Sequence, residues 1–282
     1  KTAIVQPNID PNTKWANKNK IIAIMDSLHF ESNKFKPDLV IFPETALPSY
    51  LVRDNYTRQK LQETVDSFNI PLLTGTIHAS NYSGSRYYFN SAMFLKPQSD
   101  YELYSKIHLV PFAEYDLLPA IFHPLTKLNI NIDRGRFKSG AEFVVFNWKN
   151  FLFSDLICYE SSVPRIARKF VSMGAQFLVI QANDGWLGNS YGPYQHFELA
   201  RLRAIENRVP VVRCANTGIS GIIRPDGTVQ NIIDLNQKGI ISESVNIGFE
   251  SSFYTKYGDM FAFSCFIITL VFTFYSCIKR FF

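Results

Sequence analysis

Cysteine, basic clusters and low-complexity segments are scarce in this chain of 282 residues. Its four cysteines show neither paired short spacings nor companion histidines at zinc-finger distances, which argues against a zinc site or a disulfide framework. The 29 basic and 24 acidic residues are scattered and form no basic block with interleaved aromatics, so we expect no nucleic-acid binding. No internal repeat or low-complexity linker divides the chain, which is long enough for one large core.

The start of the chain is abrupt. Its first residue is a lysine, and a strand-like run over residues 2–8 begins immediately, without an initiator methionine or a signal peptide. We therefore expect a piece of a longer protein that was cut just before a domain begins.

One uncharged apolar run stands near the C-terminus. Residues 260–278 contain no charge, proline or glycine, and at about 1.5 Å per residue this length nearly matches a bilayer core. A buried helix of a soluble protein is the alternative. Lys279 and Arg280 follow the run, whereas Lys256 and Asp259 nearly cancel before it, so the positive-inside bias places the C-terminus in the cytoplasm. We expect an external domain at 1–255, and a transmembrane helix with a short cytoplasmic end at 256–282.

Short β-rich runs alternate with helix-like segments through the rest of the chain. Nine runs are strand candidates: TAIVQ, DLVIFPE, PLLTGTI, FNSAMFL, EFVVFN, LFSDLICYE, FLVIQAND, PVVRCAN and GIIRPDG. Apolar residues have helical spacing in two segments. The first contains Ile21, Met25 and Leu28, and the second contains Phe197, Ala200 and Ala204. This alternation predicts an α/β sandwich with helices outside. Residues 117–138 lack clear periodicity and are expected to form a long loop or lid.

Several predicted strands end in polar side chains rather than in ordinary turn residues. Glu44 closes DLVIFPE, Cys158 closes LFSDLIC, and Asn183 and Asp184 close FLVIQAND. A sheet holds the backbone rigid while a side chain at a strand end projects into a crevice. We therefore expect a functional site at these strand ends.

Cys158 could be a buried small hydrophobe, half of a disulfide, a metal ligand or a nucleophile. A thiol attacks a carbonyl as the thiolate, so a catalytic cysteine needs a base or a cation nearby. His108 and His196 lie in motif-like contexts, which leaves a Cys–His protease open, although the papain-type signature is absent. Glu44 and Lys106 offer a second solution, in which a carboxylate removes the thiol proton and an ammonium stabilises the oxyanion.

Three segments carry a family resemblance: VIFPETALP with Glu44, YSKIHLVPFAEY with Lys106, and ICYES with Cys158. In this order they resemble the Glu–Lys–Cys triad of the nitrilase (carbon–nitrogen hydrolase) superfamily. More closely, SKIHLVPFAEY, ICYES, residues 181–227 and the apolar C-terminus are similar to the apolipoprotein N-acyltransferase family. The resemblance covers most of residues 1–280. It departs at DLLP after PFAEY and at GWLG, which leaves the shape of the lid open.

The resemblance implies a nitrilase-like four-layer α-β-β-α sandwich followed by a C-terminal transmembrane helix. It implies Glu44 as general base, Lys106 as oxyanion stabiliser and Cys158 as nucleophile, without a metal or a diffusible cofactor. Supporting residues would be Glu114, Tyr159 and Glu160, and walls of the substrate pocket would be Trp186, Tyr194 and His196.

The implied reaction transfers an acyl chain from a membrane phospholipid, through a Cys158 thioester, to the α-amine of a diacylglyceryl-modified apolipoprotein. The family's enzyme carries several membrane helices before this domain, so the full protein would be a multi-pass protein of the bacterial inner membrane with its catalytic domain in the periplasm. The alternatives are a membrane-anchored amidase or nitrilase that uses the same triad, and a pseudoenzyme or periplasmic scaffold.

Each site residue also has an ordinary structural interpretation. A cysteine at a strand end is usually a buried small hydrophobe, and we expect Cys214 to be one. Glu44 could cap a helix, Lys106 could be a surface charge, and Glu114 could pair with an arginine.

Overall fold

Two six-stranded sheets form the centre of the molecule. The computed structural model describes residues 1–281 except 83–84, 112, 116–136, 189 and 249–250. The first sheet has the order β12-β1-β2-β3-β4-β5 and the second β11-β10-β9-β8-β7-β6. Strands of the first sheet are β1 (Thr2–Gln6), β2 (Leu39–Ile41), β3 (Leu72–Tyr82), β4 (Ser85–Leu95), β5 (Glu102–Ser105) and β12 (Gly239–Glu243). Strands of the second are β6 (Phe146–Trp148), β7 (Phe151–Ile157), β8 (Phe177–Ala182), β9 (Val211–Ala215), β10 (Ser220–Ile223) and β11 (Val229–Ile233).

Both sheets are mixed in the same way. Strands β1, β2 and β3 are parallel, as are β7, β8 and β9, and the flanking strands pair antiparallel to them. The parallel strands are almost fully buried, because helices cover one face and the partner sheet covers the other. This explains why they stand out in the sequence as nearly continuous apolar runs.

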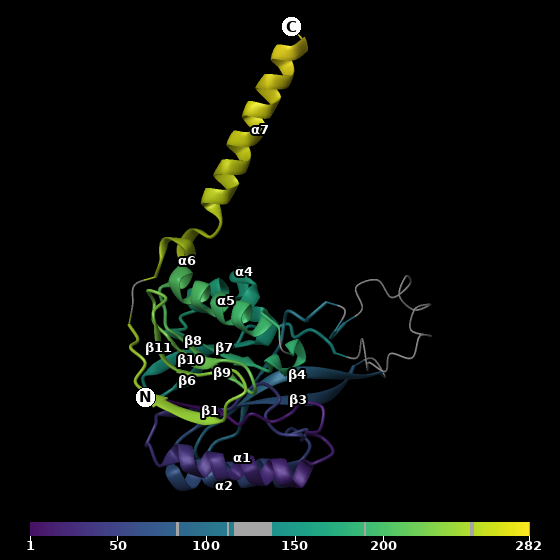
Figure 1. Ribbon diagram of the computed structural model, residues 1–282, viewed down its shortest axis with the longest axis vertical. Helices are drawn as coiled ribbons and strands as arrows, with labels where there is room; N and C mark the ends of the chain where they lie inside the picture. The colour runs from purple at the N-terminus through teal and green to yellow at the C-terminus, as the bar shows by residue number, and fades with distance from the viewer. Residues whose placement is uncertain (83–84, 112, 116–136, 189, 249–250, 282) are drawn as a thin grey trace.

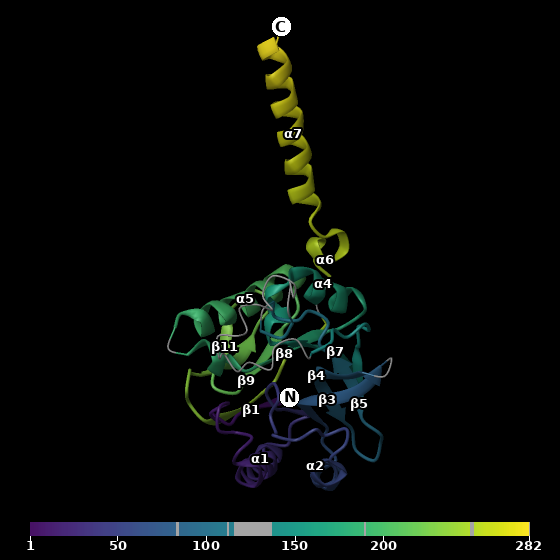
Figure 2. The same ribbon diagram turned by 90° about the vertical axis from the view of Figure 1, so that its right-hand side faces the viewer.

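Helices cover the outer face of each sheet (Figures 1 and 2). The first sheet carries α1 (Lys18–Asn33) and α2 (Asn55–Phe68), and the second carries α4 (Pro164–Ser172) and α5 (Gly192–Asn207). The predicted apolar stripe of α1 is buried at Ile21, Met25 and Leu28. The fold is therefore the four-layer α-β-β-α sandwich that the sequence predicts.

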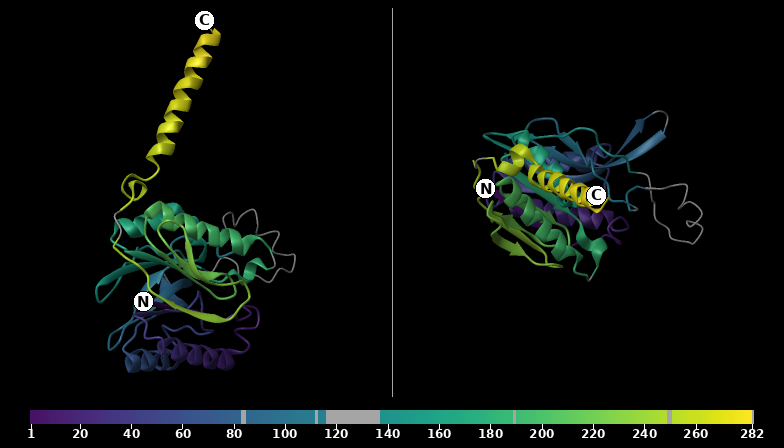
Figure 3. Two further views of the ribbon diagram at one scale, coloured as in Figure 1. Left: turned by 60° about the vertical axis from the view of Figure 1, so that its left-hand side comes forward. Right: turned by 90° about the horizontal axis from the view of Figure 1, so that it is seen from above.

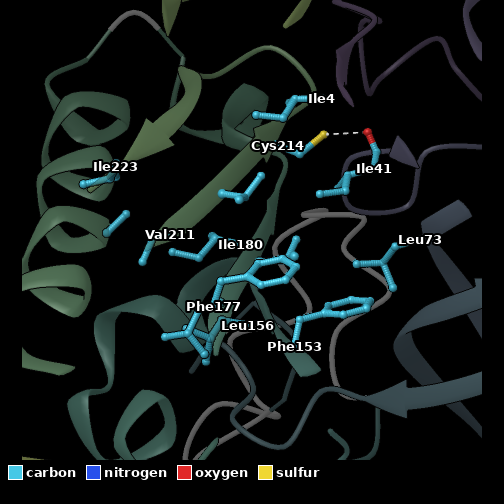
Figure 4. Close-up of a cluster of buried hydrophobic side chains, with 14 of the residues drawn as sticks. Ile4, Ile41, Leu73, Phe153, Leu156, Phe177, Ile180, Val211, Cys214 and Ile223 are labelled. Atoms are coloured by element: carbon cyan, nitrogen blue, oxygen red, sulfur yellow. Dashed lines mark hydrogen bonds between the residues drawn. The ribbon is translucent and has the colours of Figure 1, made fainter. Parts of the chain in front are cut away.

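The space between the sheets is filled mainly by aromatic and branched side chains. Phe153 packs edge-on against Phe94 with 5.2 Å between ring centroids and stacks on Phe177 at the same spacing. Figure 4 shows Phe153 and Phe177 in the same buried cluster as Ile4, Ile41 and Cys214. The Cys214 thiol is fully buried and lies within hydrogen-bond distance of the carbonyls of Val5 and Ile41, so it is a thiol of this core.

A short helix and a long one complete the chain. Helix α6 (Phe253–Tyr257) packs on α4 and α5, and α7 (Met260–Phe281) projects away from the sandwich (Figures 1 and 3). Residues 260–279 of α7 are long and apolar enough to cross a membrane, and none of this window is buried in the molecule. The predicted domain boundary between residues 255 and 256 falls inside α6 and stays a prediction.

The predicted strands were incomplete at the sheet edges. The described part of the chain contains twelve strands, of which β5, β11 and β12 are absent from the nine predicted runs. These three strands are mostly half-buried and mix polar with apolar residues, so they lack a strong apolar signal. EFVVFN forms a strand only at its end, in β6. The predicted lid lies mostly outside the described residues.

Candidate active site

Three chain segments bring Glu44, Lys106 and Cys158 together. Glu44 follows β2 and Lys106 follows β5 in the first sheet, whereas Cys158 follows β7 in the second. Glu44 is 7% exposed and Lys106 only 1%, while Cys158 is partly exposed. The site therefore lies between the two sheets at their strand ends, where burial strengthens every interaction between charges.

Cys158 stands in a strained turn. It is the first residue after β7 and the first of a 3-10 helix, η2 (Cys158–Ser162), and its φ is +52°. A non-glycine residue in this left-handed region costs of the order of 1–3 kcal/mol and persists only where the surroundings hold it. The sharp turn from strand to helix exposes the thiol at the end of the strand.

Glu44 is held against the thiol. Its Oε1 accepts a 2.7 Å hydrogen bond from the Asn90 side chain, and its negative charge acts on the Cys158 thiol. Gly75 lets β3 approach this segment, because a Cβ at Gly75 would lie only 2.4 Å from the amide nitrogen of Thr45. Burial raises the pKa of Glu44, and the nearby charge of Lys106 opposes this rise. A carboxylate in this position can accept the thiol proton.

Lys106 is a buried ammonium surrounded by acidic groups. Its Nζ lies 2.9 Å from a carboxylate oxygen of Glu114, which in turn accepts a 2.7 Å hydrogen bond from the amide of Val110. Burial alone would lower the pKa of Lys106, but the charges of Glu44, Cys158 and Glu114 outweigh it and raise the pKa. Lys106 therefore stays charged and can stabilise an oxyanion.

The thiol itself is not a preformed thiolate. Burial, together with the negative charge of Glu44, raises the pKa of Cys158 well above its ordinary value, and Lys106 only partly offsets this. The resting side chain is thus a neutral thiol, and its chemistry needs the adjacent base.

Glu160 ties the lysine segment to the cysteine strand. Its Oε1 accepts hydrogen bonds from the amides of Ile107 and His108 at 2.7 and 3.0 Å and from the Tyr104 hydroxyl at 2.8 Å. Its Oε2 accepts the amide of Ile157 at 2.8 Å. The side chain is fully buried, and burial raises its pKa. This carboxyl bridges the two sheets next to the reacting groups.

Tyr159 lies against the lysine segment, whereas Trp186 and Tyr194 lie at the surface. The Tyr159 ring stacks on His108 with 5.8 Å between centroids and an angle of 16°. Trp186, in the 3-10 helix η3 (Asp184–Leu187), is 69% exposed, and Tyr194 on α5 is 52% exposed. These two side chains therefore face the surface rather than the interior.

His196 belongs to a hydrogen-bond network with Asp184 and Arg213. Its Nδ1 lies 2.7 Å from Asp184 Oδ1, and its Nε2 lies 3.0 Å from the Cys158 carbonyl oxygen and 2.8 Å from Ser161 Oγ. Arg213 donates to Asp184 Oδ2 at 2.7 Å. Ligating atoms of Cys158, Asp184 and His196 all lie within 4.8 Å of one another, but the carboxylate and the imidazole already have these partners. Hydrogen bonding accounts for this group without a metal.

Sequence reasoning missed several members of the site. Asn90 donates to both Glu44 and Glu114, and its only signal is a polar residue inside the apolar run FNSAMFL. Lys14 is buried, and its Nζ donates to the Thr45 carbonyl, but it lies in a polar stretch without any pattern. Arg213 stands inside the strand PVVRCAN, where its pairing with Asp184 depends on tertiary structure.

The sequence that forms this site matches a known protein family over most of its length. The family model described as "Carbon-nitrogen hydrolase" matches residues 1–250. The chain belongs to the carbon-nitrogen hydrolase family.

This carbon-nitrogen hydrolase chain is similar to curated apolipoprotein N-acyltransferases. The protein of Geobacter metallireducens is 36% identical over 94% of the chain and 51% of the relative. The protein of Chlorobaculum tepidum is 32% identical over 99% of the chain and 57% of the relative. The chain thus spans about half the length of these relatives.

Solved structures of the same fold include amidases. A mutant of the Nesterenkonia AN1 amidase from the nitrilase superfamily has a TM-score of 0.63 and 16% identity, with 85% of this chain and 87% of that chain covered. A second mutant of the Nesterenkonia amidase, with acrylamide added at its active site cysteine, has a TM-score of 0.62 and 17% identity over 85% and 90%. These likenesses support the fold.

Proposed function

We propose that the protein transfers an acyl chain from a membrane phospholipid to the α-amine of a diacylglyceryl-modified N-terminal cysteine on apolipoproteins. The observation that carries the proposal is the burial of Glu44 and Lys106 beside the Cys158 thiol, where the charges of both groups act on the sulfur. This geometry suits acyl transfer through a thioester, and the similarity to apolipoprotein N-acyltransferases supplies the substrate class.

In the first half-reaction, Glu44 removes the proton from the Cys158 thiol and the sulfur attacks the ester carbonyl of the phospholipid. The oxyanion that forms is stabilised by Lys106. Collapse of this intermediate breaks the bond to the glycerol oxygen, which takes the proton from Glu44 and leaves as a lysophospholipid. An acyl thioester remains on Cys158.

In the second half-reaction, the neutral α-amine of the acceptor attacks the thioester carbonyl, and Lys106 again stabilises the oxyanion. Glu44 takes a proton from the attacking nitrogen and returns it to the departing sulfur. The products are an amide at the lipoprotein N-terminus and the resting thiol. No metal or diffusible cofactor takes part in either half.

The supporting roles follow from the contacts. Glu114 and Asn90 hold Lys106 and Glu44 in place, and Glu160 fixes the lysine segment against the cysteine strand. We assign Tyr159 to the wall of the site. The exposed Trp186 and Tyr194 would lie at the rim of the site and contact the acyl chain or the lipid surface there.

The membrane location of the substrates fits the shape of the protein. Helix α7 would anchor the domain to the bilayer, which turns a three-dimensional search for a lipid into a local one. The positive charges of Lys279 and Arg280 favour a cytoplasmic end for this helix, and we propose that residues 1–255 lie in the periplasm as part of a multi-pass inner-membrane protein.

This orientation predicts that a reporter fused after Phe282 of the full-length protein is cytoplasmic. A green fluorescent protein fusion should fluoresce, and an alkaline phosphatase fusion at the same point should be inactive. Phosphatase activity from the second fusion would contradict the orientation.

The function is tested with the full-length protein in vesicles that contain phospholipid and a synthetic diacylglyceryl-cysteine peptide. Mass spectrometry should show the peptide heavier by one acyl chain, and a peptide with an acetylated N-terminus should stay unchanged. Hydrolysis of small amides without any transfer to the peptide would instead favour a membrane-anchored amidase.

A further inference from the structure

His196 contacts the main chain of the nucleophile rather than its thiol. The Nε2 atom lies 3.0 Å from the Cys158 carbonyl oxygen and 2.8 Å from Ser161 Oγ, and the Ser161 hydroxyl donates to the same carbonyl at 2.7 Å. Two side chains thus converge on one carbonyl. It belongs to the residue whose φ is +52°.

The imidazole of His196 is held at its other nitrogen, Nδ1, by Asp184. Asp184 Oδ1 lies 2.7 Å from Nδ1, and Asp184 Oδ2 accepts from Arg213, whose Nε donates to the Ile219 carbonyl at 3.0 Å. The Asp184 and Arg213 side chains are 1% and 0% exposed, so this chain of contacts is buried over its whole length. Gly218 leaves room for it, because a Cβ there would lie 2.1 Å from Asp184 Oδ2.

These contacts argue against His196 as the base. Each ring nitrogen has a partner in either tautomer, because Nδ1 lies beside Asp184 Oδ1 and the donor Arg213 Nη2, and Nε2 lies beside the Cys158 carbonyl and the Ser161 hydroxyl. In the part of the chain that the structure describes, His196 contacts the carbonyl oxygen of Cys158, whereas the thiol is subject to the charges of Glu44 and Lys106. A Cys–His mechanism would need a ring nitrogen directed at the sulfur.

We propose that His196, held by Asp184 and Arg213, is a positioning residue that keeps the Cys158 turn in its strained conformation. A trans peptide is planar, so fixing the Cys158 carbonyl also fixes the Tyr159 N–H, which points away from His196. With the peptide plane held, the thiol keeps its place between Glu44 and Lys106. A displacement of about 1 Å at such a centre can cost about a hundredfold in rate.

The inference rests on the proposed acyl-enzyme but not on the identity of the lipid. Its test therefore uses a soluble acyl donor, p-nitrophenyl butyrate, with the full-length protein and measures the pre-steady-state burst of p-nitrophenol. If the wild-type protein gives a burst but never acylates a lipopeptide, the proposed substrate is wrong and the role of His196 is still measured.

Two variants separate positioning from proton transfer. His196→Leu should slow the burst by about tenfold to a hundredfold, and His196→Gln should restore most of the rate, because an amide can donate to the Cys158 carbonyl. The pH midpoint of Cys158 alkylation by iodoacetamide should stay that of the wild type in both, since Glu44 is intact.

Three outcomes would overturn the inference. A wild-type burst in His196→Leu would show that the contact has no role. Equal losses in both variants, or a shifted pH midpoint of alkylation, would make His196 a proton carrier. If His196→Leu does not fold, His196→Asn takes its place, because its amide is one methylene shorter than that of Gln, and the same criterion applies: a burst as fast as that of the wild type would contradict the proposal.

Discussion

Glu44 and Lys106 flank one sulfur but have opposite charges, so their loss should affect the reaction differently. Glu44→Gln should slow thioester formation most at low pH and recover only in part as pH rises above about 8.5, the ordinary pKa of a thiol, because burial still raises the pKa of Cys158. Recovery is aided because the substitution also removes the negative charge that raises the pKa of Cys158. Rates of Cys158 acylation between pH 6 and 10, measured in single turnovers, give this profile.

Lys106→Met should show no such recovery. The oxyanion lacks its cation at every pH, and loss of one such donor typically costs about a hundredfold to a thousandfold. Circular dichroism controls for folding, since the substitution leaves Glu114 without its ion pair. Parallel pH profiles for the two variants would mean that the roles of base and oxyanion partner are wrongly assigned.

Lys14 offers a pH test of stability. Burial lowers its pKa to about 8, against about 10.4 for an unfolded lysine. Between these pKa values the unfolded chain binds more protons than the folded one. The free energy of unfolding of the wild type therefore rises with pH in this range. The free energy of unfolding of Lys14→Met should therefore exceed that of the wild type most below pH 8. The difference should be up to about 3 kcal/mol, less the contribution of the lost contact with Thr45.

The measurement for Lys14 is thermal melting of both proteins at pH 7 and at pH 10. The melting temperature of Lys14→Met relative to the wild type should be higher at pH 7 than at pH 10. A difference that does not vary with pH would show that the ammonium is well solvated.

The strand-end positions of Glu44 and Cys158 were predictable from the sequence, because a polar side chain that follows an apolar run is conspicuous. The part played by His196 was not, since its contact with the Cys158 carbonyl exists only when α5 packs against η2. Lys14 and Asn90 likewise reach the site through tertiary contacts rather than through any local pattern.

Among the elements, α6 connects the catalytic sandwich to α7. Arg168 of α4 donates from Nε to the carbonyls of Tyr254 and Thr255 at 3.0 and 3.1 Å, and from its terminal nitrogen to that of Lys256 at 3.2 Å. These acceptors lie in the last residues of a five-residue helix, whose free carbonyls need partners. Arg168 therefore ties α6 to α4, while Thr255 and the N-cap Ser252 are hydrogen-bonded to α5 through Asn207 and Glu206.

Arg168→Met should loosen α6 without unfolding the sandwich. Amide hydrogen exchange at residues 253–258 should accelerate by about tenfold or more, while exchange in β7 and β8 stays slow. Lys169→Met is the matched control, because Lys169 is an exposed cation on the same helix. Equal exchange in both variants would show that Arg168 does not hold α6.

Element types were more predictable than their number. The parallel strands are buried on both faces, which makes them conspicuous, whereas β5, β11 and β12 lie at or next to sheet edges and mix polar with apolar residues. Helices α2 and α4 were not predicted. Helix α4 is only nine residues long, and α2 buries just Thr57, Leu61 and Val65, so neither has a long apolar pattern.

For the molecule as a whole, the site lies between two sheets, of which the first is completed by a distant part of the chain. Strand β12 pairs with β1 in this sheet, so residues near both ends of the domain close it, whereas the second sheet consists of the consecutive strands β6 to β11. A sandwich assembled in this way presents the ends of β2, β5 and β7 to one another. That arrangement brings a base, a cation and a thiol into a single buried site.

The central claim is that Cys158 carries the acyl group. Full-length protein incubated with phospholipid vesicles, quenched in acid and digested, should yield a peptide containing Cys158 that is heavier by one acyl chain in its mass spectrum. The adduct should be absent from Cys158→Ala and present in Cys214→Ala, whose thiol is buried in the core. Loss of the adduct in both variants, or an adduct on any other residue of the wild type, would contradict the account.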